Sequence, residues 1–213
     1  MYKMRVLVFD TETSGLIPKK YESIDECPYI LQLACILVDT DGSKIINKKD
    51  SINEIINAPI NKLDDKVMEI TGLTIEKVKS GVDIIPMLEK FKNMLENSDV
   101  LVAHNLEFDL KMIKIEFERN NIELNTSRSS YCTMKNSTQI CNIQRENSFG
   151  KYLKWPTLEE LHKHLFPGLD VKNLHDAYVD SILCLRCYLM LNCKLDIYER
   201  KEEFRNEINS LIN

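Results

Sequence analysis

Two carboxylates stand two residues apart at the end of an apolar segment, Val6-Leu7-Val8-Phe9-Asp10-Thr11-Glu12. If this segment is a strand, its side chains alternate between faces, so Asp10 and Glu12 lie side by side with Cα atoms about 7 Å apart. Neighbouring acids beside a buried strand are costly unless a cation lies between them, and a hard divalent metal ion is the usual solution. The alternative is an ordinary solvated strand end, and this segment alone does not decide between the two.

A third acid, Asp109, follows a short apolar stretch at 99–103 and the dipeptide His104-Asn105. It falls in the first turn of a helix predicted over residues 107–121. A carboxylate is favoured there by the helix dipole, so a purely structural role is a credible alternative to metal binding.

A fourth acid, Asp180, shares one face of a predicted helix over 174–193 with Ala177, Cys184 and Cys187. An acid on an apolar helix face needs a partner. We interpret the nearby Asp176 as a capping or first-turn acid without a catalytic role. Taken alone, His175 at the helix start is interpreted as a capping or surface residue.

The composition indicates an intracellular globular protein. With 213 residues and 44% hydrophobic content, the chain has the size of one domain with a substantial core. Its net charge of −5 excludes nucleic-acid binding by bulk positive charge alone. The first residues lack the apolar segment of a signal peptide, and the apolar run at 182–191 is interrupted by Arg186 and too short to span a bilayer. We therefore expect a cytoplasmic protein that does not bind membranes.

Seven cysteines are scattered along the chain, several inside apolar runs, as expected for reduced thiols. Cys184-x-x-Cys187 and His162-x-His164 raise the alternative of a zinc or redox protein. The cysteine pair lies in a strongly helical run with no second pair at zinc-ligand spacing. Histidines two residues apart on a helix do not share a face. We predict core packing for the cysteine pair.

The order of the predicted elements favours an α/β fold. Apolar strands at 6–10, 30–38 and 43–47, the last two joined by an Asp-Gly turn, predict an antiparallel meander. A buried strand at 99–103 and helices over 64–70, 83–97, 107–121, 157–166 and 174–193 follow. Strands that alternate with helices after a meander indicate a mixed sheet flanked by helices. Residues 125–155 are the least regular part, with one brief strand candidate at 130–134.

The last residues, 195–213, are predicted to form an amphipathic helix following a domain over 1–194. Ile197, Phe204, Ile208 and Leu211 lie on one stripe of this helix. We expect the stripe to pack on the domain itself. Helical spacing alone leaves open its use by a polymerase or by a second copy of the chain.

Together these pieces resemble a family. Residues 9–16 (Phe-Asp-Thr-Glu-Thr-Ser-Gly-Leu), Ala103-His104-Asn105 with Asp109, and His175-Asp176-Ala177-x-x-Asp180 resemble the three motifs of the DEDDh superfamily of exonucleases, over about residues 5–193. That superfamily includes the proofreading epsilon subunit of bacterial replicative DNA polymerase, ribonuclease T and oligoribonuclease. The resemblance implies a ribonuclease-H-like fold with a mixed five-stranded sheet.

The resemblance also implies roles for individual residues. Asp10, Glu12, Asp109 and Asp180 are expected to hold two Mg²⁺ ions, with Mn²⁺ as a substitute, and His175 is expected to be the general base. Backbone near Thr13 and Gly15 is expected to meet the terminal nucleotide, with Leu16 wedged against a base. Where the family often has histidine in His-Gly-Ile-Thr, this chain has Thr71. The remaining expected substrate contacts are Thr11, His104, Asn105 and Phe108.

The expected activity is therefore metal-dependent 3′–5′ hydrolysis of nucleic acid with a free, single-stranded 3′ end, releasing nucleoside 5′-monophosphates. DNA is the preferred substrate, in proofreading or repair, and RNA or short oligoribonucleotides are the alternative. Basic residues within 128–154 are candidates for contacting phosphates, or else belong to an ordinary solvated loop. A polymerase or a homodimer partner remains open. The intact acids and histidine argue against a non-catalytic nucleic-acid-binding module.

Overall fold

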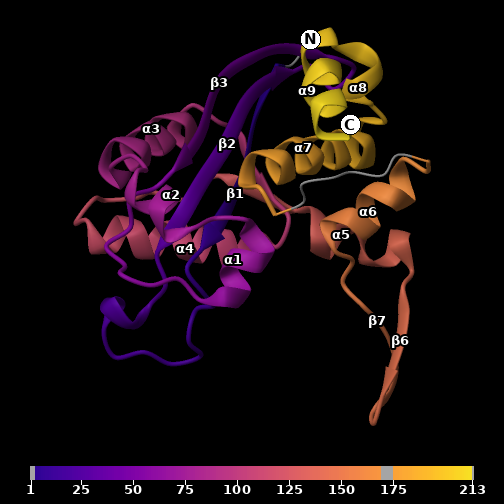
Figure 1. The fold of residues 1–213 in the computed structure, drawn as a ribbon. Coiled ribbons are helices and arrows are strands. Elements are labelled where there is room, and N and C mark those ends of the chain that lie inside the picture. The colour runs from indigo at the N-terminus through magenta and orange to yellow at the C-terminus, as the bar shows by residue number, and fades with distance from the viewer. Residues whose placement is uncertain (1–2, 169–174, 213) are drawn as a thin grey trace.

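The computed structural model describes residues 3–168 and 175–212 of the chain. Five strands form one mixed sheet in the order β3-β2-β1-β4-β5 (Figure 1). Their bounds are β1 (Met4–Thr13), β2 (Ile30–Thr40), β3 (Ile45–Ile55), β4 (Val100–Ala103) and β5 (Ser129–Cys132). The first three strands pair antiparallel. β4 pairs parallel to β1, and β5 pairs parallel to β4. The predicted meander and mixed sheet are confirmed.

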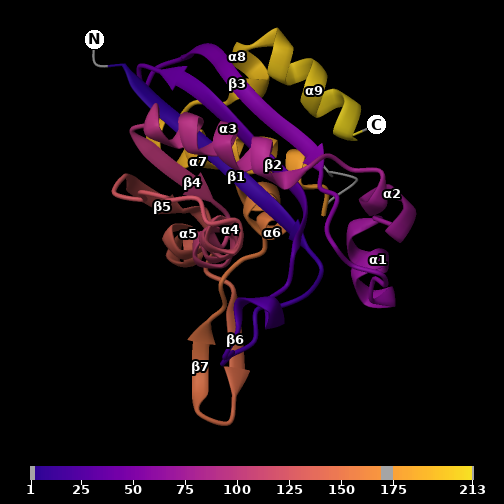
Figure 2. The ribbon, with the colours of Figure 1, turned by 90° about the vertical axis from the view of Figure 1, so that its left-hand side faces the viewer.

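Helices cover both faces of this sheet (Figures 1 and 2). The connections before β4 hold a 3-10 turn, η1 (Ile24–Glu26), and the helices α1 (Asp65–Thr71), α2 (Ile75–Lys79) and α3 (Ile84–Glu96). After β4 come α4 (Leu106–Arg119), α5 (Thr133–Cys141), a separate hairpin of β6 (Gln144–Asn147) and β7 (Gly150–Leu153), α6 (Leu158–Leu165), α7 (Ala177–Cys193), α8 (Ile197–Arg200) and α9 (Glu202–Ile212).

Alternation along β1 divides the core into two layers. Val6 and Val8 pack in a cluster with α6, α7 and the C-terminal helices. Leu7 and Phe9 point to the other face and pack with α3 and α4. Because both faces are covered, every residue of β2 is buried. The carboxyl ends of β1 and β4 meet at one edge of the sheet because these two strands are parallel.

The structure differs from the sequence-based expectation mainly between residues 125 and 155, where α5 and the β6–β7 hairpin were not predicted. The third strand is also longer than expected, because its polar residues pair with β2 along nearly its full length. The C-terminal segment forms two helices, with Ile197, Phe204 and Ile208 buried in the cluster that contains α7. The side chain of Leu211 and residue Leu174 lie outside the described part.

All seven cysteines are free thiols, and Cys184 and Cys187 are buried core residues, as predicted. Within residues 3–168 and 175–212, no helix combines the length and apolar character needed to cross a membrane.

Candidate active site

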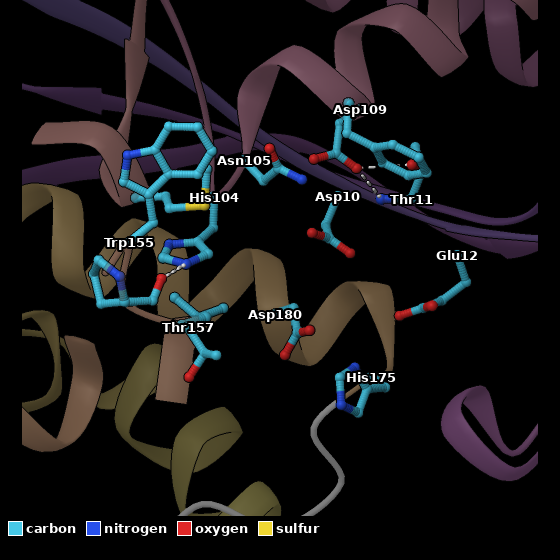
Figure 3. A pocket seen from close by; sticks show the side chains of 14 residues that line it. Asp10, Thr11, Glu12, His104, Asn105, Asp109, Trp155, Thr157, His175 and Asp180 are labelled. Atoms are coloured by element: carbon cyan, nitrogen blue, oxygen red, sulfur yellow. Dashed lines mark hydrogen bonds between the residues drawn. The ribbon is translucent and has the colours of Figure 1, made fainter. Parts of the chain in front are cut away.

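The first two acids of the site come from the end of β1. Asp10 pairs with Ala34 and Glu12 with Gln32 on β2, so both side chains leave the same face of the sheet as Val6 and Val8. Figure 3 shows their carboxylates turned toward the space in front of α7. The strand therefore places the two acids side by side, as its alternation predicts.

Asp109 reaches the site from the first turn of α4. The helix begins after Asn105, whose left-handed backbone (φ 67°) turns the chain sharply at the end of β4. Asp109 is only 3% exposed, and its Oδ1 accepts hydrogen bonds from the backbone N–H of Thr11 (3.2 Å) and from the Thr11 hydroxyl (2.8 Å). Thr11, between the two acids of β1, thus connects the third acid to them.

Asp180 is held by the start of α7. Asp176 caps this helix, accepting from the N–H groups of Tyr178 (3.0 Å) and Val179 (3.2 Å), which agrees with the predicted capping role. Gln32 fixes the cap to the sheet: its Oε1 accepts from the Ala177 N–H and its Nε2 donates to Asp176 Oδ2, both at 3.2 Å.

Gln32 is a positioning residue that the sequence analysis did not identify. The signal was present, because Gln32 is a single amide inside the apolar run 30–38, and a buried amide needs hydrogen-bond partners. Its third partner is Asn53 of β3, whose Oδ1 accepts from Gln32 Nε2 at 3.1 Å.

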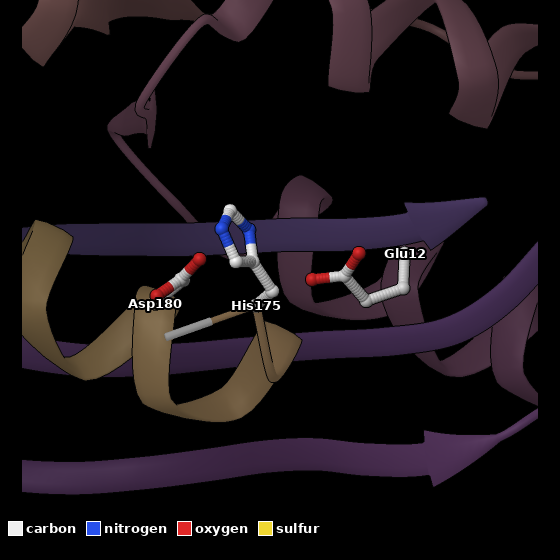
Figure 4. A group of neighbouring side chains, drawn as sticks. All are labelled: Glu12, His175 and Asp180. Carbon is white, nitrogen blue, oxygen red and sulfur yellow. The ribbon is translucent and has the colours of Figure 1, made fainter. Parts of the chain in front are cut away.

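His175 lies at the mouth of the site, immediately before the cap of α7. It is exposed and has a left-handed backbone conformation (φ 71°). Figure 4 shows its imidazole between the carboxylates of Glu12 and Asp180, and ligand atoms of the three residues lie within 4.8 Å of one another. The structure therefore brings together the predicted histidine and the four predicted acids in one cavity.

Burial and mutual repulsion shift the acids strongly toward their neutral forms. Burial raises the pKa of Glu12 to about 8, helped by the charges of Asp180 and Asp109. Burial, followed by repulsion from neighbouring acids, also raises the pKa of Asp10 well above its ordinary value. The pKa values of Asp109 and Asp180 rise mainly through burial, although hydrogen bonds from Thr11 and from the His175 backbone oppose the shifts.

The donor set fits divalent metal ions. None of the ion pairs found within the described residues involves these four carboxylates, and Asp180 Oδ1 is buried without a hydrogen-bond partner. Buried carboxylates without cations are costly, and hard divalent ions prefer oxygen ligands of this kind. The site therefore lacks the positive charge that such ions would supply.

The cavity around the acids has a volume of about 460 Å³ and is closed on one side by residues 155–158. His104 holds this side in place: burial lowers its pKa to about 4, so its ring is neutral. Nε2 lies 3.1 Å from the Pro156 carbonyl, which can only accept, so Nε2 carries the proton and Nδ1 accepts from the Thr133 hydroxyl at 2.9 Å. Both ring nitrogens thus have partners within the protein, and His104 acts on the site by positioning its wall.

The other residues expected to contact substrate line the same cavity or the one next to it. Asn105 and Phe108 border the acids. Thr13, Gly15 and Leu16 line an adjoining cavity of about 560 Å³, which also includes Ile70, Thr71 and Phe108. The Thr13 hydroxyl donates to the Gly15 carbonyl at 2.8 Å, which shapes the loop, and Leu16 is 85% exposed.

Comparison with known proteins gives one family match and several relatives. The model of the RNase_T family, described as an exonuclease family, matches residues 7–188. DNA polymerase III PolC-type of Lactococcus lactis is 30% identical over 126 residues, covering 59% of this chain and 7% of that protein. DNA polymerase III subunit epsilon of Buchnera aphidicola is 27% identical over 195 residues, covering 90% of this chain and 74% of that protein. The chain thus spans less than a tenth of the length of the Lactococcus relative.

Solved structures of similar fold include two kinds of nuclease. The nuclease domain of 3′hExo, a DEDDh family member bound to rAMP, has a TM-score of 0.64 at 16% identity, covering 91% of this chain and 96% of that one. E. coli Exonuclease I in complex with a dA16 oligonucleotide has a TM-score of 0.63 at 15% identity, covering 97% of this chain and 43% of that one. At these identities the likeness concerns the fold.

Proposed function

Because the chain belongs to the RNase_T exonuclease family and is a DEDDh 3′–5′ exonuclease, we propose that it removes nucleotides from single-stranded 3′ ends of DNA in a metal-dependent reaction. The product of each step is a nucleoside 5′-monophosphate. The observation that carries the metal dependence is the cluster of four buried or half-buried carboxylates without a cationic partner in the described structure.

Asp10, Glu12, Asp109 and Asp180 hold two Mg²⁺ ions in this proposal, with Mn²⁺ as a substitute. When bound, a pair of such ions neutralises the phosphate and stabilises the attacking and leaving oxygens of an in-line displacement. Thr11 keeps Asp109 turned toward the acids of β1, and Gln32 keeps α7 and hence Asp180 in place.

His175 acts as the general base. Its exposed imidazole lies next to the acids and can accept a proton from the attacking water while the phosphodiester bond breaks. Imidazole is the side chain most often used to accept a proton in general base catalysis. Because the residue is at the mouth of the cavity, the proton can pass on to solvent.

The 3′-terminal nucleotide occupies the adjoining cavity between the 13–16 loop and α1. Leu16 is exposed there and offers an apolar surface for a base, while Phe108 lies between the two cavities. Contact with the face of a base tolerates any sequence, which suits an enzyme that trims strands one nucleotide at a time.

DNA and a proofreading role are favoured by the names of the relatives, which are components of DNA polymerase III. By the same argument a polymerase is the favoured partner. RNA is the second candidate substrate, since the nuclease domain of 3′hExo has a similar fold and is bound to rAMP.

Single-stranded DNA and RNA oligomers labelled at either end test the proposal, incubated with Mg²⁺, Mn²⁺ or EDTA. We expect stepwise shortening of 5′-labelled DNA with either metal and none in EDTA. Asp10→Ala should abolish the reaction while the protein keeps its fold by circular dichroism. Faster degradation of RNA than of DNA would make RNA the preferred substrate in place of DNA. Absence of metal-dependent loss of nucleotides from the 3′ end of any oligomer would refute the proposal.

A further inference from the structure

The β6–β7 hairpin, which connects α5 to α6, extends away from the body of the molecule (Figures 1 and 2). All residues of β6 and all but Leu153 of β7 are exposed. A two-stranded ribbon without a core is at best marginally stable and adds little to the packing of a domain. The hairpin therefore needs another explanation than stabilisation of the fold.

The surface of the hairpin differs from that of the whole chain in charge. Residues 143–155 contain three basic side chains (Arg145, Lys151 and Lys154) and one acid (Glu146), a net charge of +2 in a chain of net charge −5. Arg145 lies directly opposite Tyr152 in the ladder, so a cation and an aromatic ring share one face of the ribbon.

Aromatic side chains are exposed along the length of the hairpin. Phe149 at the tip is 97% exposed, Tyr152 in β7 is 48% exposed and Trp155 at the base is 57% exposed. Large apolar side chains of this kind are rarely left in solvent together without a binding function. Basic residues interleaved with aromatic rings are the combination that binds single-stranded nucleic acid, because the rings stack on bases and the cations contact phosphates.

The base of the hairpin is fixed to the wall of the active site. Lys154 pairs with Glu160 of α6 at 2.7 Å, and Glu160 also accepts from the Thr157 N–H at 2.8 Å in the capping box of that helix. Pro156 accepts from His104, and Trp155 lines the cavity of the four acids (Figure 3). Lys135 lies 5.7 Å from the centre of the Trp155 ring. The hairpin thus starts at the wall of the catalytic cavity, and its exposed aromatic residues extend from Trp155 at that wall to Phe149 at the tip.

We propose that the β6–β7 hairpin is an arm that binds the single strand on the 5′ side of the scissile nucleotide, with Trp155, Tyr152 and Phe149 stacking on bases and Arg145, on the same face as Tyr152, contacting phosphates. The proposal rests on the proposed exonuclease function and names the substrate class: a strand of several nucleotides. Each strand of the hairpin has four residues, a length of roughly 13 Å at ~3.3 Å per residue, so a dinucleotide in the cavity does not reach the tip.

The test compares wild-type protein with two variants, Phe149→Ala/Tyr152→Ala and Arg145→Gln, on a dinucleotide and on a single strand of about 15 nucleotides. Lys44→Gln is the matched control, since it removes one exposed cation from the β2–β3 turn at the other end of the sheet. The readouts are kcat/KM for each substrate with Mg²⁺, and binding of the labelled long strand in EDTA by fluorescence anisotropy, which does not depend on catalysis.

We expect the ratio of kcat/KM for the long strand to that for the dinucleotide to fall roughly tenfold or more in the aromatic variant, with a matching loss of strand binding in EDTA. Arg145→Gln should weaken long-strand binding and lower its salt dependence, and Lys44→Gln should behave as wild type. If both hairpin variants kept the wild-type ratio of kcat/KM values and wild-type strand binding, the proposed strand-binding role of the hairpin would be overturned, while the exonuclease function would stand. Absence of metal-dependent cleavage of either substrate by wild-type protein would instead refute the exonuclease function.

Discussion

Glu12 shows what the fold does to a single carboxyl group. Burial and the neighbouring acids raise its pKa from 4.5 to about 8, so the folded protein holds this proton more tightly than the unfolded chain. A carboxyl group whose pKa is raised by folding makes the metal-free protein less stable as the pH rises. This loss of stability begins near the pKa of the group in the unfolded chain and is complete above its pKa in the folded protein. The histidines with lowered pKa values, His104 and His162, act in the opposite direction and only below about pH 6.5.

Metal-free protein should therefore lose several degrees in Tm, roughly 3–6 °C, between about pH 6.5 and pH 8.5. Differential scanning fluorimetry in EDTA measures this loss. Glu12→Gln should reduce it, and Glu123→Gln, which changes an exposed glutamate, should not. Added Mg²⁺ should restore stability at high pH in wild type, since a ligand that binds only the folded state stabilises it. A Tm that rises over this pH range in EDTA would contradict the assigned direction of the shift.

His175 allows a second test at the same scale. His175→Ala should lower kcat by roughly 10²–10⁴, the usual contribution of a general base. The Mg²⁺ concentration that gives half of the Tm increase should stay close to that of wild type, because the acids alone hold the metal in the proposal. The reverse outcome, a large loss of Mg²⁺ affinity with little change in kcat, would make His175 a ligand.

Among the elements, the start of α7 decides whether the acids meet. Gln32 is 5% exposed and bonds both Asp176 and the Ala177 N–H, so it ties the helix to the strand that pairs with β1. Gln32→Leu keeps the volume but removes these bonds, and a displacement of about 1 Å in catalytic groups can cost roughly a hundredfold in rate. We expect a fall in kcat of about ten- to a hundredfold with a folded protein. Gln139→Leu, an exposed glutamine of α5, is the control and should leave kcat unchanged.

The elements also show where sequence patterns are informative. Asp64 and Gly72 bound α1, and Thr157 and Glu160 begin α6, because capping is a local interaction between residues a few positions apart. The side-by-side acids of β1 were predictable from strand alternation. Asp109 and Asp180 were candidates from their places on predicted helices, and the family resemblance joined them with His175 in one site.

The β6–β7 hairpin and the role of Gln32 were not predicted, each for a different physical reason. The hairpin has no buried face, so its sequence carries no period of apolar residues. Gln32 acts through Asp176 and Ala177, more than 140 positions away in the chain, and such a contact leaves only a single amide in an apolar strand as its trace.

At the scale of the whole molecule, the C-terminal helices are attached to the domain through a buried charge. Arg186 of α7 is 1% exposed and donates from Nε and Nη2 to Asp196, the cap of α8, at 2.8 and 2.7 Å. Its guanidinium also lies 3.8 Å from the centre of the Phe166 ring. We propose that residues 195–212 unfold together with the rest of the domain as one unit.

Removing one partner of this pair leaves the other charge buried and unpaired, which typically costs about 3–5 kcal/mol. Asp196→Ala should therefore lower the free energy of unfolding by about this amount, measured by urea denaturation followed by circular dichroism. The double variant Arg186→Met/Asp196→Leu should recover much of the loss, because an apolar pair of similar volume carries no desolvation cost. If the C-terminal helices were a separate unit, Asp196→Ala would instead produce an early, small transition and leave the main transition at its wild-type position.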